Sequence, residues 1–183
     1  MGKSLPDKYQ YREVPMLIKV YGTGSKSFKA MAREAIRHAA AKFFDKRILD
    51  HLEVTLKLDP NLLAVTGDVA QMEWVDNNVR AKVYNIYLDS NLSDFLKVLS
   101  IMHEMVHVKQ YAKGELTQSL KDCNLHKWNR SEWINEGKVS YWDLPWEIEA
   151  HGREKGMLIS WMTSTALLSE EDKVEWRSKF MFI

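Results

Sequence analysis

The residues best suited to chemistry lie in one short segment, His103-Glu104-Met105-Val106-His107, which has the pattern HExxH. Residues four apart lie on the same face of an α-helix, so the two imidazoles can bind one metal ion. Glu104 follows the first histidine, where its carboxylate would lie beside a water molecule on that metal. Two neutral nitrogen ligands and a carboxylate base are what a zinc hydrolase requires. The pattern predicts a Zn²⁺ site with His103 and His107 as ligands and Glu104 as the general base.

The segment that carries this motif, residues 91–111, is predicted to be a helix that is buried on most sides. Its apolar residues follow helical spacing, with Asn91 or Ser93 as the N-cap and Asp94 in the first turn. Polar groups that are buried without partners cost a few kcal/mol each, so two histidines and a glutamate in such a helix need partners. A metal ion bound by these side chains would be such a partner.

A catalytic zinc usually has three protein ligands and one position for water, so a third ligand is needed. The best candidate region is residues 144–154, where Pro145 suits the first turn of a helix that extends to about Leu168. Glu147 and His151 are four apart and share a face of this helix. Either Glu147 binds the metal while His151 supports a ligand, or His151 is itself the third ligand. The alternative is an ordinary helix start, with acids near the positive end of the helix dipole.

An HExxH motif followed by a glutamate helix of the form E-x-x-A-(D/N/H) resembles the gluzincin metallopeptidases, especially the small single-domain minigluzincin type. The resemblance implies Glu147 as the zinc ligand and His151, where Asp or Asn is more usual, as a helper that hydrogen-bonds a ligand. Residues 141–150 are also similar to segments of small phage-encoded HExxH proteins. The resemblance further implies an exposed edge strand beside the active-site helix that binds extended peptide.

The order of the expected elements predicts an α+β fold, a compact zincin-like domain. A strand at 14–21 and a turn at 22–25 precede a long N-terminal helix at 27–46; the turn lacks the glycines of a phosphate loop. The strands of a small twisted sheet are expected at 52–58, 62–69, 71–75 and 81–88, before the HExxH helix and the C-terminal glutamate helix. Residues 82–87 could offer the peptide-binding edge, or they could form an interior strand without a ligand.

Residues 114–141 show little periodicity and suggest a hairpin or loop. Four tryptophans could line a substrate groove or cover a core: Trp128, Trp133, Trp142 and Trp146. His126 or Tyr141 could donate a hydrogen bond to an oxyanion, and the sequence does not assign that role. Residues 169–172 fit a capping box before a last short helix, and the apolar end at 180–183 is predicted to dock on the core.

Length and composition indicate one globular domain that spans residues 1–183, because 45% hydrophobic residues suffice for a substantial core. The net charge of +1 argues against broad electrostatic capture of nucleic acid. The single cysteine, Cys123, excludes an intramolecular disulfide and a cysteine-rich metal site. No apolar run resembles a signal peptide or a membrane span, so we expect a cytoplasmic protein. The resemblance of residues 141–150 implies that it is phage-encoded in a bacterial host.

Together these features predict a zinc-dependent metallohydrolase, best described as a peptidase that acts on a peptide or protein substrate. Its Zn²⁺ ligands would be His103, His107 and Glu147. One alternative is a zinc-stabilised binding protein without activity; Glu104 weighs against it, because a structural site needs no general base. A second alternative is a DNA-associated protease similar to the SprT-like group, which would need a basic surface patch. Substrate, cleavage specificity and oligomeric state do not follow from the sequence.

Overall fold

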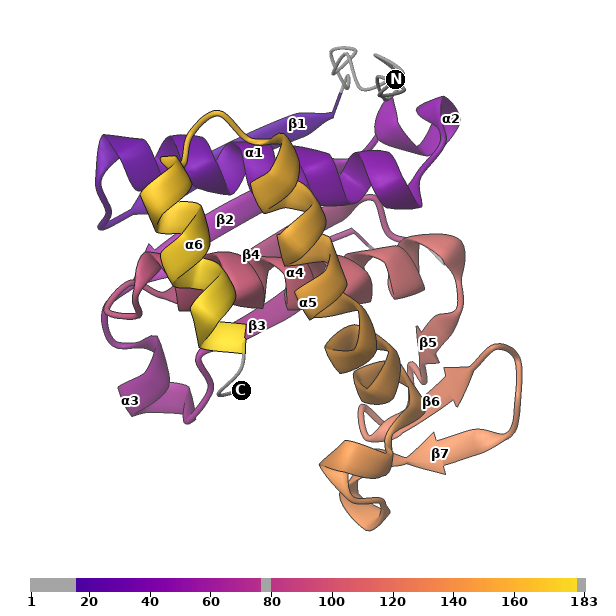
Figure 1. Ribbon diagram of the computed structural model, residues 1–183. Coiled ribbons are helices and arrows are strands. Elements are labelled where there is room, and N and C mark those ends of the chain that lie inside the picture. The colour runs from indigo at the N-terminus through magenta and orange to yellow at the C-terminus, as the bar shows by residue number, and fades with distance from the viewer. Residues whose placement is uncertain (1–15, 77–79, 181–183) are drawn as a thin grey trace, which may run out of the picture.

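The computed structural model describes residues 16–76 and 80–180. Helices and strands alternate in the first half, and two long helices carry the second half (Figure 1). The elements in chain order are β1 (Leu17–Gly22), α1 (Lys26–Phe43), α2 (Lys46–Leu49), β2 (Glu53–Asp59), α3 (Leu62–Thr66), β3 (Ala70–Trp74), β4 (Val83–Asp89), α4 (Asp94–Lys113), β5 (Leu116–Gln118), β6 (Leu125–Trp128), β7 (Trp133–Asn135), the 3₁₀ turns η1 (Glu136–Lys138) and η2 (Tyr141–Asp143), α5 (Pro145–Ser164) and α6 (Glu170–Lys179).

The main sheet has four strands in the order β1-β2-β4-β3. β1, β2 and β4 are parallel, whereas β3 runs antiparallel to β4 and forms one edge. Parallel neighbours need a crossover connection, and α1 lies in the connection between β1 and β2. α1 and α4 pack against each other and against the sheet, and α5 packs against both of these helices (Figure 1). The chain therefore has the expected α+β fold, with α4 at its centre.

The strand at 82–87 is interior, so it does not supply a peptide-binding edge. β4 pairs with β2 on one side and with β3 on the other. Its inward side chains Tyr84, Ile86 and Leu88 are fully buried, which is typical of a strand covered by neighbours. The edge closest to α4 is instead β3, since α4 contacts β3 and β4 but β3 is the outer of the two.

Residues 62–69 do not form the expected strand. Residues 62–66 form the short helix α3, which ends at Gly67 with a left-handed φ of 83°. The carboxylate of Asp89 accepts a hydrogen bond from the backbone N–H of Leu63 at 3.0 Å and so satisfies a donor at the start of this helix. Of the α3 residues only Leu62 is buried, because the other apolar side chains have no sheet to cover them.

The two long helices begin as the sequence indicates, and α4 also ends as it does, whereas α5 ends at Ser164 and not near Leu168. Ser93 caps α4, with its Oγ accepting from the N–H of Leu96, and Gly114 ends that helix with a φ of 69°. α4 is buried on most sides, including its motif residues. Pro145 occupies the first turn of α5, where its missing N–H costs nothing. These helices hold the HExxH segment and the glutamate segment against each other in the core.

Three further local predictions are confirmed, whereas the helix expected at 27–46 ends at Phe43 and a separate short helix begins at Lys46. Ser25 caps α1, so residues 22–25 are a strand-to-helix turn. A capping box between Ser169 and Asp172 starts α6. The ring of Phe180 lies 5.4 Å from that of Phe95 in the core, and the last three residues of the predicted docking segment lie outside the described part of the chain.

The segment between the long helices folds as a three-stranded antiparallel sheet, β5-β6-β7. It has its own small core, in which Leu116 packs with Leu144 and Trp146 at the start of α5. This sheet lies beyond the end of α4 and beside the start of α5 (Figure 1). Over the described residues, no helix has the length and apolar character needed to cross a membrane.

Candidate metal centre

Three side chains from α4 and α5 meet at one point in the core. The Nε2 atoms of His103 and His107 lie 3.1 Å apart. The carboxylate of Glu147 reaches both rings, with one oxygen 3.3 Å from Nε2 of His103 and the other 3.5 Å from Nε2 of His107. All three residues are buried, and they form one of two groups among the described residues that could hold a metal ion. The packing of α5 on α4 therefore brings three of the predicted site residues together.

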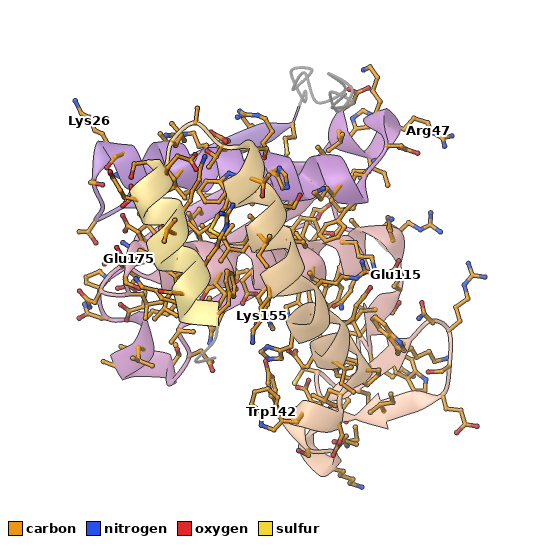
Figure 2. The ribbon with its side chains drawn as sticks, viewed as in Figure 1. Lys26, Arg47, Glu115, Trp142, Lys155 and Glu175 are labelled. Carbon is orange, nitrogen blue, oxygen red and sulfur yellow. The ribbon has the colours of Figure 1, made fainter. Side chains whose placement is uncertain are left out.

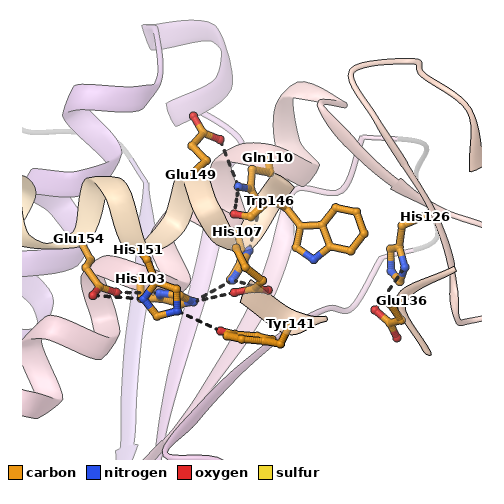
Figure 3. A network of polar contacts seen from close by, with 11 residues as sticks. His103, His107, Gln110, His126, Glu136, Tyr141, Trp146, Glu149, His151 and Glu154 are labelled. Atoms are coloured by element: carbon orange, nitrogen blue, oxygen red, sulfur yellow. Dashed lines mark hydrogen bonds and ion pairs between the residues drawn. The ribbon is translucent and has the colours of Figure 1, made fainter. Parts of the chain in front are cut away.

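The second nitrogen of each histidine ring is held by a neighbour. Nδ1 of His103 lies 2.8 Å from Oε2 of Glu154, and Nδ1 of His107 lies 2.8 Å from Oε1 of Gln110 (Figure 3). Each of these bonds fits an Nδ1–H donor, which leaves the Nε2 lone pair for a metal. The side-chain nitrogen of Gln110 donates in turn to the Trp146 carbonyl and to Glu149, so its oxygen must face His107.

His151 lies beside the three convergent residues and not among them. Its ring is 4.6 Å from the His103 ring, centroid to centroid. Its Nδ1 lies 3.3 Å from Oε1 of Glu154, and its Nε2 lies 3.3 Å from the Tyr141 hydroxyl. The second group that could hold a metal is His103 with His151 and Glu154, so the two groups share His103. The family resemblance implied that His151 hydrogen-bonds a metal ligand; the residue that contacts Nδ1 of the predicted ligand His103 is instead Glu154.

The charges of the site are strongly coupled. Burial favours the neutral form of His103, but hydrogen bonds with Glu147 and Glu154 outweigh it and raise its pKa from 6.5 to about 10. Burial also favours the neutral form of His107, but its hydrogen bond with Glu147 outweighs burial, so the pKa of His107 is raised as well. The pKa of Glu147 is lowered well below its usual range, because contacts with both histidines overcome its burial. The positive charge of the protonated imidazoles and the negative charge of the Glu147 carboxylate thus stabilise each other.

Glu104 and Tyr141 face the same cleft as the three convergent residues. This cleft has a volume of about 380 Å³, and His103, Glu104, His107, Tyr141 and Glu147 all line it. Burial raises the pKa of Glu104, which favours a carboxylate that can take up a proton. Burial raises the pKa of Tyr141, and a side-chain hydrogen bond with Glu147 is the second cause of this increase. A protonated hydroxyl is therefore available beside the carboxylate.

The aromatic residues of the small sheet are distributed unevenly around the cleft. Of the four tryptophans considered, only Trp146 lines it. Trp133 and Trp142 are 46% and 67% exposed, and the Trp142 ring, labelled in Figure 2, lies 5.0 Å from that of His151 between centroids. His126 also lines the cleft, but with Glu136 it lies beyond Trp146 and apart from His103 and His107 (Figure 3).

Sequence reasoning missed two residues that contact the convergent histidines, Glu154 and Gln110. Glu154 follows Glu147 by seven positions, two helical turns, so helical spacing alone places both on one face of α5. Gln110 follows His107 by three positions on α4. Spacing identifies both as candidates, but only the packing of the two helices shows which nitrogen each one reaches.

Comparisons with known proteins add no relative. No protein-family model, curated protein or solved structure matches this chain.

Proposed function

We propose that this chain is a zinc-dependent metallohydrolase with a zincin-like, gluzincin-type site, acting as a peptidase. The observation that carries the proposal is the convergence of His103, His107 and Glu147: the two Nε2 atoms lie 3.1 Å apart, and each lies 3.3 or 3.5 Å from a different oxygen of the Glu147 carboxylate. Zinc bonds of 2.0–2.1 Å at tetrahedral angles separate neighbouring ligand atoms by about 3.3 Å. The donor set therefore fits zinc with little movement.

Two further features favour a metal over an ordinary buried ion cluster. The buried Glu147 carboxylate contacts the two Nε2 atoms at 3.3 and 3.5 Å, longer than the 2.7–2.9 Å usual for a charged hydrogen bond, so a cation between these groups would satisfy the carboxylate better. The Nδ1 atoms of both histidines are occupied by Glu154 and Gln110, so both rings can bind through Nε2. A histidine pair without a metal role would not need this matched orientation.

A zinc ion at this position would polarise a substrate carbonyl and lower the pKa of a water molecule to about 7. Glu104, which lines the same cleft, would accept the proton of the attacking water and deliver it to the leaving amine. Its raised pKa suits both halves of this transfer.

We assign the oxyanion donor to Tyr141. Its hydroxyl contacts Glu147 and His151 at the rim of the convergent site, and it lines the cleft beside Glu104. A hydroxyl at this place can donate to the carbonyl oxygen as negative charge develops on it. His126 also lines the cleft, but it lies beyond Trp146 (Figure 3), too far along the cleft to share this task.

The substrate backbone would pair with β3. This strand is bonded to β4 on one side only, and Ala70, Gln71, Met72 and Glu73 line the cleft. An extended peptide can add to such an edge through main-chain hydrogen bonds. A role for the cleft in binding DNA is not favoured, because no lysine or arginine is among the described residues that line it.

Elemental mass spectrometry of the purified protein tests the metal site. We expect about one zinc per chain, lost in Glu147→Ala and retained in His151→Ala. Loss in His151→Ala alone would instead assign the third ligand to His151. A protein that takes up no zinc even after reconstitution would refute the hydrolase proposal.

Hydrolysis of a denatured protein such as casein by the zinc-loaded chain tests the chemistry. Glu104→Gln should retain zinc and lose activity by about 10²–10⁴-fold, the usual contribution of a general base. Full activity in Glu104→Gln with zinc bound would refute the mechanism. Zinc binding without hydrolysis of any peptide would support the zinc-stabilised binding protein.

A further inference from the structure

The cleft carries far more negative than positive charge. Beyond Glu104 and Glu147 it is lined by Asp68, Glu73 and Glu136, and no lysine or arginine is among its described lining residues. A divalent cation would balance Glu104 and Glu147. Of the other three carboxylates, Glu73 has Lys57 as a nearby cation behind Tyr87, and the ring beside Glu136 is that of His126, so the cleft keeps a negative excess. A negative cleft raises the local concentration of cationic ligands and repels anionic ones.

One of these acids, Glu73, is held in a fixed orientation on the edge strand. Asn85 Nδ2 and the Tyr87 hydroxyl both donate to Oε1 of Glu73, each at 2.7 Å. Lys57 in turn donates to the Tyr87 oxygen at 2.9 Å. The hydrogen bond from Asn85, and after it the one from Tyr87, lowers the pKa of Glu73; burial raises this pKa by less. Both bonds use one oxygen, so among the described residues Oε2 has no donor and can accept from a ligand.

The position of Glu73 on β3 determines which substrate residue it would meet. Met72 packs on the main core, so its neighbours Gln71 and Glu73 point to the opposite face of the sheet. In a chain that pairs with β3, the residue directly opposite Glu73 would project to that same face. Directly opposed side chains have Cβ atoms about 5 Å apart, where opposite charges attract and like charges repel.

The far wall of the cleft contains a second polar group that lacks a hydrogen bond. His126 of β6 is 5% exposed, and its Nδ1 is buried without a hydrogen-bond partner. Its ring packs 5.2 Å from Trp146, and Nδ1 lies 3.4 Å from a carboxylate oxygen of Glu136. Burial lowers the pKa of His126, so this wall contributes a neutral ring and one negative charge. An unsatisfied buried nitrogen in a cleft is a position where a ligand can form a hydrogen bond.

We propose that this cleft selects peptides with a lysine or arginine at the residue that pairs opposite Glu73. The selectivity comes from the Glu73 carboxylate directly and from Asp68 and Glu136 through their field. The proposal rests on the proposed peptidase function, since it assigns the substrate class of the same site.

The test measures binding without requiring cleavage. Three peptides, acetyl-Ala-Ala-X-Ala-Ala-amide with X as Lys, Gln or Glu, carry charge only at X. They are titrated into zinc-loaded, ¹⁵N-labelled Glu104→Gln protein, and dissociation constants are obtained from the amide shifts of β3. Partly exposed ion pairs change affinity severalfold, so we expect the Lys peptide to bind about tenfold tighter than the Glu peptide.

Adding Glu73→Gln should reduce that ratio to about threefold or less, since it removes the charge and keeps the shape. The matched control is Glu171→Gln, on the exposed face of α6, which should leave the ratio unchanged. Equal binding of the three peptides, no binding of any of them at millimolar concentration, or a ratio unaffected by Glu73→Gln would overturn the proposal. Selective binding without hydrolysis by the parent chain would refute the peptidase function but not the charge selectivity. If the protein does not bind zinc, the same titrations are made with the zinc-free protein.

Discussion

Glu154 offers the sharpest test of how this site is built, because it contacts His103 and is not a predicted ligand. Its Oε2 lies 2.8 Å from Nδ1 of His103, on the side of the ring opposite Glu147. Glu154 is only 7% exposed, so water has little access to replace a truncated side chain. Glu154→Ala should leave the three proposed zinc ligands in place but free the His103 ring to rotate and make its Nε2 less basic.

The expected loss follows from what such outer partners contribute to metal sites. Removing one typically weakens metal affinity 10–100-fold, which is about 1.4–2.7 kcal/mol. Glu154→Gln keeps an oxygen that can accept from Nδ1–H and loses only the charge, so its loss should fall near the lower limit of that range. Glu147→Ala, which removes a ligand, should weaken binding more than either substitution of Glu154.

Competition with a chromophoric chelator measures these affinities for the folded variants. Thermal unfolding of each zinc-free protein shows that the fold is intact. His151→Ala is the matched control, because His151 contacts Glu154 and stacks near His103 but makes no hydrogen bond to the convergent residues. Zinc affinity in Glu154→Ala equal to that of the parent chain, or a loss in His151→Ala as large as in Glu147→Ala, would refute this reasoning.

Two predictions concern protons. Because the pKa of His103 is near 10, the zinc-free protein holds a proton on this ring at pH 7.5. Zinc binding should therefore release at least one proton, and zinc affinity should increase by about tenfold per pH unit between pH 7 and 9. Calorimetric heats of zinc binding that do not depend on the ionisation enthalpy of the buffer would contradict this. Burial, aided by Lys42, lowers the pKa of His38 from 6.5 to about 4, so below pH 6.5 the unfolded chain binds a proton that the folded chain excludes. Stability should therefore fall by up to about 3 kcal/mol between pH 6.5 and 4. His38→Gln should remove that decline in urea unfolding of the zinc-free protein, and an unchanged slope would count against it.

Local spacing predicted the residues that share a helix face but not those that depend on how helices cross. His103 and His107, four apart on α4, converge as expected, and Glu147 meets them because α5 packs on α4. The preference for Glu147 over His151 came from a resemblance, and helix spacing alone allowed both. The partner of His103 Nδ1 could not be chosen from the sequence, since His151 and Glu154 are both near that ring in space.

The strand predictions that the structure corrects also depended on contacts between distant residues. Residues 62–66 are apolar enough to suggest a strand, but a distant carboxylate, that of Asp89, satisfies the first turn of a helix there. Strand order is equally non-local: the apolar alternation of 82–87 suits an interior or an edge strand with one buried face. Pairing with β2 and β3 makes it interior, so the edge near α4 is β3, which carries Glu73.

The arrangement of α5 explains why the helper residue lies seven positions after Glu147 and not four. Glu147 reaches Nε2 of His103 and Glu154 reaches Nδ1, so the two carboxylates hold opposite sides of one ring. Seven residues rise about 10.5 Å along a helix and return to nearly the same face. The ring of His103 therefore lies alongside α5 between two glutamates, and His151, one turn after Glu147, packs on that ring at 4.6 Å. A shorter Asp at position 154 would not span this distance, so Glu154→Asp should behave like Glu154→Ala in zinc affinity and not like Glu154→Gln.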